Sequence, residues 1–255
     1  PKYINTRYAF GADANKLEPP FIPEGQGMVG IYRKDLTLEV PTVHHRMILS
    51  IGGFSSAVTV FLNGQVLCYA ENGRTACEVD LTDAVRPGQN LLLLRVDEFS
   101  PGSYLECQDM FRENGIFRDV LLYTYDKAYI NDYEVKTRLN GGREYDLDID
   151  VFLEGEAAGK KVSAYLFSGR KKICSDEKDA DVCVKFSFSA LDVKEWTAET
   201  PKLYSLILKL EKGGELCEII RRNIGFKHIH IHKNVFYFNN KKIKLLGVNH
   251  HDTDP

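Results

Sequence analysis

Residues 59–67, TVFLNGQVL, decide the fold class of this protein. An Asn-Gly step lies between two arms that are rich in β-branched, aromatic and aliphatic residues. Asn and Gly accept the positive φ angles of a two-residue hairpin turn more readily than other residues do. The stretch therefore predicts two antiparallel strands joined by a tight turn.

Strand-like runs bounded by Gly, Pro, Asn and Asp recur about every ten residues on both sides of this hairpin. In the first half they cover residues 31–40, 47–51, 57–62, 91–96 and 120–125, and in the second 146–153, 161–167, 182–188, 204–210 and 216–224. About seven short strands over roughly 100 residues are typical of an immunoglobulin-like sandwich. No stretch keeps a helical apolar period for three turns, and only residues 81–85 suggest one short turn, with Asp80 or Thr82 as its N-cap.

The length and composition restrict the classes of protein that remain. With 255 residues and 29.0 kDa, the chain makes one large domain or two ordinary ones. It has 33 basic and 36 acidic residues with interspersed signs, which argues against a dedicated nucleic-acid surface. No apolar run approaches the roughly 20 residues that a bilayer span needs, so we expect no membrane segment. No leader with a basic and an apolar region opens the chain, and we expect a cytoplasmic protein.

The cysteines and histidines do not form a recognisable metal motif. Six cysteines without a CxxC pair predict reduced thiols in strands rather than a zinc knuckle or disulfides: Cys68, Cys77, Cys107, Cys174, Cys183 and Cys217. His228, His230 and His232 alternate with isoleucines, so they share one strand face and could bind a metal ion. The alternative, which we favour because no acidic or Cys cluster accompanies them, is a strand with its apolar face inward and its polar face in solvent. His44 and His45 are expected at the surface.

Three further segments carry candidate functions. Trp196 could be a sugar-stacking platform, but the Pro201 and Leu203 that follow favour a packing anchor. Residues 99–111 mix acids, aromatics and turn formers, which suits contact with a sugar or a cation, although a solvated surface loop is the plain alternative. Residues 236–243 predict a second Asn-centred hairpin, and residues 244–249, KLLGVN, predict a buried strand. Ionisable residues after such a strand are how the active site of a barrel enzyme begins.

Several of these strings together resemble glycoside hydrolase family 2, and within it the β-galactosidases of the large bacterial type. The most specific is GSYLECQDMFRENGIFRDV, residues 102–120. The others are GIYR at 30–33, FLNG at 61–64, EVDLT at 78–82, WTAETPKLY at 196–204, GFK at 225–227 and FNNKKIKLLGVNHH at 238–251. They follow the order of the family along essentially the whole chain.

The resemblance implies an all-β pair of domains. Residues 1–126 would form a jelly-roll-like sugar-binding sandwich whose N-terminus is truncated, and residues 127–228 an immunoglobulin-like sandwich. Residues 229–255 would begin a TIM barrel that the chain does not contain. The acid/base and nucleophile Glu residues would lie beyond Pro255, so we expect no catalytic residue here and no hydrolysis by this chain alone. The parent would be a homo-oligomer that hydrolyses terminal β-D-galactosides with retention.

The resemblance also carries two site residues over to this sequence. Asp109 matches the family's Asp that contacts the galactose 6-hydroxyl region and a sodium ion, and an acceptor-only carboxylate suits both. His251 matches the His that hydrogen-bonds the galactosyl group near the transition state. Magnesium and sodium are expected in the parent, and no cofactor is expected in this chain by itself. Gly27 stands where the family often has a substrate-contacting Asn, and His250 where it usually has an Arg.

Three rival functions remain at this point. A stand-alone carbohydrate-binding module would have its own aromatic platform and measurable affinity for a sugar. A structural scaffold would serve only assembly of the parent. Another family 2 glycosidase, such as a β-glucuronidase, would share the domains but not the substrate. The loop that ends at Met110 favours a galactosidase, because a binding module has no need of a carboxylate directed at a partner domain.

Overall fold

The computed structural model describes residues 17–38, 46–106 and 113–249. Within these ranges the regular structure is almost entirely strand, and its one helical element is the short 3-10 helix η3 (Pro101–Tyr104). None of the described residues forms a helix that is long and apolar enough to cross a bilayer. The chain divides between Tyr125 and Asp126 into two compact units, each with a hydrophobic core of its own.

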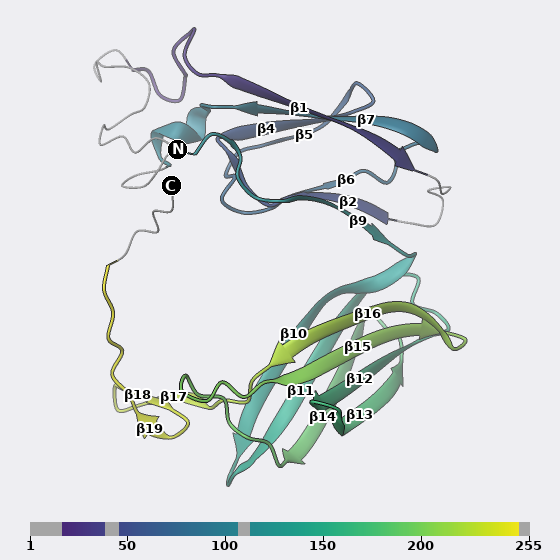
Figure 1. Ribbon diagram of the computed structural model, residues 1–255, viewed down its shortest axis with the longest axis vertical. Coiled ribbons are helices and arrows are strands. Elements are labelled where there is room, and N and C mark those ends of the chain that lie inside the picture. The colour runs from purple at the N-terminus through teal and green to yellow at the C-terminus, as the bar shows by residue number, and fades with distance from the viewer. Residues whose placement is uncertain (1–16, 39–45, 107–112, 250–255) are drawn as a thin grey trace. The chain divides into compact units, whose positions relative to one another are not determined.

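The first unit is a sandwich of two antiparallel sheets, drawn as facing layers in Figure 1. One sheet has the order β1 (Val29–Leu38), β7 (Gly88–Asp97), β4 (Ala57–Leu62) and β5 (Gln65–Ala70). The other has the order β6 (Cys77–Asp80), β2 (Arg46–Ile51) and β9 (Val120–Tyr125). A two-stranded pair, β3 (Phe54–Ser55) and β8 (Gly115–Ile116), lies outside these two sheets.

The predicted Asn-Gly hairpin joins β4 to β5. Asn63 and Gly64 both have positive φ angles, of 52° and 85°, as the two central residues of a type I′ turn require. Asn63 is also held from the side: its Nδ2 donates to Asn90 Oδ1 at 2.9 Å, and its Oδ1 accepts from Leu91 N at 3.0 Å. Alternate residues of β4 and β7 are buried, which places one face of each strand in the core.

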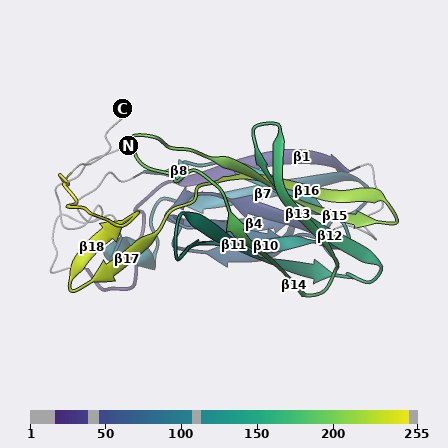
Figure 2. The same ribbon diagram turned by 90° about the horizontal axis from the view of Figure 1, so that it is seen from below.

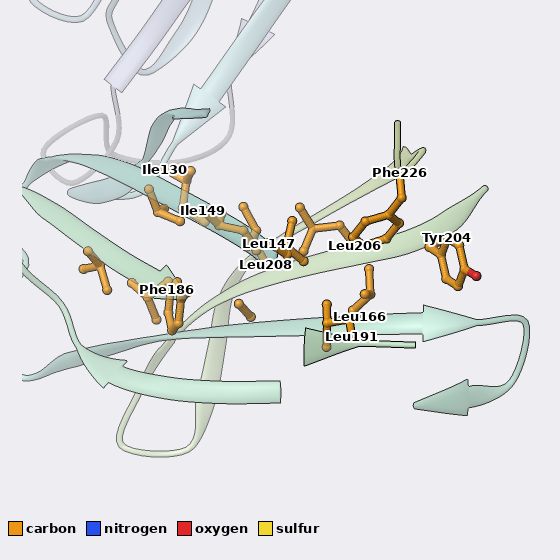
Figure 3. Packing of buried hydrophobic residues seen from close by; sticks show 14 of the residues in the cluster. Ile130, Leu147, Ile149, Leu166, Phe186, Leu191, Tyr204, Leu206, Leu208 and Phe226 are labelled. Carbon is orange, nitrogen blue, oxygen red and sulfur yellow. The ribbon is translucent and has the colours of Figure 1, made fainter. Parts of the chain in front are cut away.

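The second unit is a seven-stranded sandwich, the strand count typical of an immunoglobulin-like domain. One sheet has the order β10 (Ala128–Asn140), β11 (Glu144–Gly155) and β14 (Cys183–Leu191). The other has the order β13 (Lys171–Asp179), β12 (Lys160–Ser168), β15 (Tyr204–Lys212) and β16 (Glu215–Ile224). Figure 3 shows apolar side chains from both sheets meeting in the core, with Leu147 beside Leu208. The all-β class and the two sandwiches agree with the prediction.

An aromatic cluster closes one end of this second core. Phe226 is fully buried and meets Tyr145 and Tyr204 edge to face, with ring centroids 5.6 and 5.3 Å apart. Both phenol groups find partners: Tyr145 donates to Glu195 Oε1 at 2.8 Å, and Tyr204 Oη accepts from Lys194 N at 2.7 Å. Burial, followed by the bond to Glu195, raises the pKa of Tyr145. The tyrosines therefore bury their rings without leaving an unsatisfied hydroxyl.

A small sheet of β17 (Ile229–His232), β18 (Val235–Phe238) and β19 (Lys241–Lys242) follows this sandwich. Figures 1 and 2 both place its hairpin at one end of the second unit. Asn239 and Asn240 have positive φ angles, so the predicted Asn-centred hairpin is present. Asn239 Nδ2 donates to the carbonyl of Trp196 at 3.0 Å, which ties the hairpin to the sandwich.

The prediction of a buried strand at residues 244–249 is wrong. These residues form no strand, and Leu245, Leu246 and Val248 are 77%, 86% and 90% exposed. A strand needs a hydrogen-bonded neighbour, and the described residues supply none to this segment. The apolar run is therefore insufficient on its own to make a strand.

Candidate functional site

The candidate site is built from the described residues on either side of residues 107–112, in the first unit. Asp109, the predicted substrate and sodium ligand, lies in that segment and so outside the described residues. The structure does describe both flanks: η3 before the segment, and residues 113–119 after it. Their contacts show which chemical groups the two flanks carry.

Glu71 anchors the flank that precedes the segment. Its Oε2 accepts from the backbone N–H of Gly102 at 3.0 Å and from the Ser100 hydroxyl at 3.3 Å, while its Oε1 accepts from the Tyr69 hydroxyl at 2.7 Å. Burial and then the hydrogen bond to Glu71 raise the pKa of Tyr69 to about 12, so this phenol stays protonated at neutral pH. Tyr104 then donates to the carbonyl of Phe21 at 2.6 Å, which fixes the end of η3.

Two arginines anchor the flank that follows the segment. Arg74 Nη1 lies 2.8 Å from Glu113 Oε2, and its guanidinium lies over the ring of Phe117, 4.9 Å from the centroid. Arg118 covers the same ring at 5.4 Å and donates to the carbonyls of Gly52 and Arg74, at 3.1 and 2.7 Å. These contacts hold this flank in place.

Glu98 links the residue that precedes β1 to the flank that follows residues 107–112. Its Oε2 accepts from Met28 N at 2.8 Å, and its Oε1 accepts from Asn114 Nδ2 at 3.1 Å. Beside it, Gly27 has φ +88°, and a Cβ on Gly27 would lie 2.9 Å from Cδ2 of Phe99. The Asn that the family often has here would be strained and would have to displace that ring. Phe99 therefore occupies the space next to Gly27 that the side chain of such an Asn would enter.

A polar depression lies between these anchors. It is lined by Ser55, Ser56, Glu98, Phe99, Ser103, Glu106, Glu113 and Asn114. Carboxylates, hydroxyls and an amide beside one aromatic ring are the groups that bind sugar hydroxyls and the apolar face of a sugar ring. At about 10 Å³ the described depression has room for no more than about one water molecule, so it shows the chemical character of the two flanks rather than a complete sugar pocket.

The described residues do not supply a cation site by themselves. Searched over the described part of the chain, no three His, Cys, Asp or Glu side chains are grouped closely enough to hold a metal ion. Glu71, Glu98 and Glu113 already accept hydrogen bonds or pair with an arginine. The sodium role of Asp109 stays a prediction, and no such group among the described residues fits the expected magnesium.

The histidine strand differs from both of its sequence interpretations. Ile229 and Ile231 are 47% and 73% exposed, whereas His228 and His230 are half-buried, so the favoured interpretation with isoleucines inward is wrong. The cause is aromatic packing: His230 stacks on its cross-strand partner Tyr237 with centroids 4.8 Å apart and an interplanar angle of 3°. His230 Nδ1 is buried without a hydrogen-bond partner.

The remaining residues singled out in the sequence are Trp196, the other histidines and the cysteines. Trp196 is a packing anchor, as favoured: its ring meets Phe238 edge to face at 5.9 Å, and its backbone N–H donates to the carbonyl of Phe226 at 2.8 Å. His251, His250, His44 and His45 lie outside the described residues. The five described cysteines are free thiols, and each lies in a strand, as expected.

Sequence reasoning missed Glu71, Arg74 and Glu98. Glu71 and Arg74 belong to the connection between β5 and β6, and Glu98 follows β7 directly. Their contacts join residues 31, 39 and 70 positions apart along the chain. No local spacing signals such pairs, although the composition of residues 99–111 and the resemblance of residues 102–120 both pointed to this region.

Comparison with known proteins identifies the two units. The family description "Glycosyl hydrolases family 2, sugar binding domain" matches residues 1–126, and "Glycosyl hydrolases family 2" matches residues 128–227. The β-galactosidases of Streptococcus thermophilus and Halalkalibacterium halodurans are 33% and 34% identical to this chain over 99% of it. In each case the chain spans only 25% of the relative's length.

Solved structures share the fold. The β-glucuronidase of Bifidobacterium dentium matches 85% of this chain and 42% of its own, with a TM-score of 0.70 and 22% identity. At that identity the likeness shows the architecture alone. The two family matches, in order and nearly end to end, show that the chain belongs to glycosyl hydrolase family 2 and comprises its sugar-binding and immunoglobulin-like domains.

Proposed function

We propose that this chain is the sugar-binding and immunoglobulin-like part of a β-galactosidase that hydrolyses terminal β-D-galactosides with retention. One observation carries the proposal: curated β-galactosidases align with 98–100% of this chain, up to 35% identical. Since the chain spans about a quarter of those relatives, the hydrolytic residues are proposed to lie in the remainder of the protein that carries it. The proposed role of this part is support of the catalytic domain and a share of the sugar site.

Asp109 is the residue that this chain is proposed to contribute to the substrate. The contacts of the two described flanks support this proposal, since Glu71 holds the preceding flank, Arg74 pairs with Glu113 in the following one, and residues of both flanks line the polar depression. A carboxylate there would accept hydrogen bonds from galactose hydroxyls and could serve as an oxygen ligand of sodium. His251 is proposed to hydrogen-bond the galactosyl group as positive charge develops on the sugar.

The β-glucuronidases are the second candidate, because solved members of that group share this fold. A glucuronide carries a carboxylate at the position of the galactose 6-hydroxyl. Asp109, placed near that position, would repel it, and like charges in contact are destabilising. Glu98, Glu106 and Glu113 line the described depression, and Arg74 pairs with Glu113. This acidic rim favours the neutral galactoside.

The test is steady-state kinetics on the protein that carries this chain, with a chromogenic β-galactoside. Asp109→Ala should remove a charged hydrogen-bonding partner and cost about 2–4 kcal/mol, or roughly 30- to 1,000-fold in kcat/KM, together with any activation by sodium. His251→Phe should lower kcat more than it raises KM, because its proposed bond strengthens in the transition state.

The matched control is Asp119→Ala, which removes the same charge from an exposed position in the same string. It should leave kcat/KM and the sodium response unchanged. Wild-type kinetics with unchanged sodium dependence in Asp109→Ala would contradict the assignment. An equal loss in both variants would show that the effect is one of net charge or stability rather than of substrate contact.

A further inference from the structure

An apolar pocket opens along one side of the first unit, between its two sheets. β1 is an edge strand of one sheet and β9 an edge strand of the other, and both line the pocket. Leu92 and Leu94 form part of its wall on the first sheet, and Leu49 and Leu122 on the second. Its volume of about 330 Å³ falls in the range of roughly 300–1,000 Å³ that small-molecule pockets have. Val120 and Leu122 pack against the core and are only half-buried, so a ligand can reach apolar surface here.

Tyr32 forms part of the pocket wall and reaches across it. Its Oη accepts from the N–H of Ile116 at 3.4 Å, so the side chain extends from β1 to β8. Gly115 leaves room for this hydroxyl, because a Cβ at that position would clash with it. Apart from this ring, the apolar walls on both sheets are aliphatic side chains of Leu, Ile and Val. A thin, unbranched alkyl chain therefore suits the space between the two sheets better than a bulky ring system does.

Lys34 brings a positive charge to this apolar pocket. It lies on the core-facing side of β1 together with Tyr32 and Leu36, and its side chain lines the pocket. No hydrogen bond or ion pair joins Lys34 to another residue that the structure describes. Arg33 also lines the pocket, but it pairs with Asp35 at 3.5 Å. Over the same described residues no acidic side chain lines the pocket, so its charge is complementary to an anion.

We propose that this pocket binds an unbranched aliphatic carboxylate of medium length, such as octanoate. The alkyl chain lies between the two sheets, where it removes apolar walls from water. The carboxylate lies at the mouth and accepts a charge-assisted hydrogen bond from the Lys34 ammonium group. The pocket shares no lining residue with the polar depression, so this proposal stands independently of the proposed galactosidase function.

A plainer role for Lys34 makes different predictions. A charged residue on the inward side of an edge strand discourages that strand from pairing with another chain. That role needs the charge alone and no ligand. It therefore predicts neither a preference for an anion over a neutral molecule of the same length nor any effect of alkyl chain length.

The test titrates the whole chain with hexanoate, octanoate and 1-octanol in a calorimeter. Each methylene that the pocket buries should tighten binding about fourfold, so octanoate should bind on the order of tenfold more tightly than hexanoate. Octanoate should also bind about three- to fivefold more tightly than 1-octanol, because only the anion pairs with Lys34. This second advantage should shrink in high salt. Equal affinities for hexanoate and octanoate, or for octanoate and 1-octanol, would overturn the proposal.

Three variants locate the site. Lys34→Gln, at an exposed position, should reduce the affinity for octanoate to that for 1-octanol. The control Arg95→Gln removes a cation from the opposite, exposed face of the same sheet and should change neither affinity. Leu36→Trp should fill the pocket and abolish binding, with a circular dichroism spectrum to check that the variant is folded.

Two results from these variants would contradict the assignment. One is a Lys34→Gln chain that keeps the wild-type preference for octanoate over 1-octanol. The other is a folded Leu36→Trp chain that binds octanoate as wild type does. The titration is repeated on the protein that carries this chain. Octanoate binding by the chain that disappears there would also overturn the proposal, because another part of that protein would then cover the pocket.

Discussion

Asp80 caps the short turn at residues 81–85, for which the sequence offered either Asp80 or Thr82 as the N-cap. Its Oδ1 accepts from Thr82 N at 2.9 Å, and its Oδ2 accepts from Arg46 Nε at 3.2 Å. Leu81 O then accepts from the N–H groups of Ala84 and Val85, so Asp80 caps the predicted short turn. Burial alone would raise the pKa of Asp80, but the hydrogen bonds from Thr82 and Arg46 outweigh it and lower this pKa.

Replacing Asp80 by Ala should therefore destabilise the chain in a pH-dependent way. Loss of the cap should cost about 1 kcal/mol at pH 7. A carboxyl whose pKa is lowered by folding contributes stability that is present above its unfolded pKa of about 3.9 and is lost as the pH falls through the lower folded pKa. The difference in unfolding free energy between wild type and Asp80→Ala, measured in urea, should shrink below about pH 4.

Asp83→Ala is the control, because Asp83 is exposed in the same turn. It should change the unfolding free energy by no more than about 0.5 kcal/mol at either pH. A difference for Asp80→Ala that stays constant, or that grows on acidification, would show that the carboxylate does not stabilise this turn.

Strands that were predicted and strands that were missed differ in what forms them. β4 and β9 run from Ala57 to Leu62 and from Val120 to Tyr125, as predicted, because each is a local apolar run that turn-forming residues delimit. β13, KKICSDEKD, is mostly exposed and charged, and β10 alternates polar residues over most of its length. These two are edge strands that exist because β12 and β11 offer them a hydrogen-bonding edge. Local composition does not reveal whether a segment will find such a neighbour. It therefore predicted neither these two strands nor the lack of a strand at residues 244–249.

The end of β11 and the connection from it to β12 offer a test at the level of elements. Gly155 and Gly159 both have positive φ angles, of +90° and +72°. A Cβ on Gly155 would lie 1.7 Å from the Lys127 carbonyl oxygen, whereas a Cβ on Gly159 would meet nothing within 4 Å. Both Gly→Ala changes pay the same kind of backbone strain, so their difference isolates the steric clash.

Gly155→Ala should consequently be the more destabilising change, by about 2 kcal/mol or more, because the strand backbone must move. Gly159→Ala should cost about 1 kcal/mol from its φ angle alone. Urea denaturation of both variants measures the two costs. Equal losses of unfolding free energy would mean that Lys127 does not approach Gly155 this closely.

On the scale of the whole molecule, the sequence predicted the two sandwiches better than the site. Both sandwiches follow from recurring strand signals and from strings that run in the family's order. The site does not, since its anchors join Glu71 to Gly102 and Arg74 to Glu113, pairs that only the folded sandwich brings together. Asp109 and His251 remain predictions that rest on the resemblance.

The measurement that tests the central claim most directly is the ratio of kcat/KM for a β-galactoside and a β-glucuronide with the same chromogenic leaving group. It is made on the protein that carries this chain. We expect the galactoside to be preferred by at least about 100-fold, because a glucuronide carboxylate would face Asp109 and the acidic rim at a cost of roughly 3 kcal/mol. A ratio near one, or preference for the glucuronide, would contradict the proposed galactosidase function.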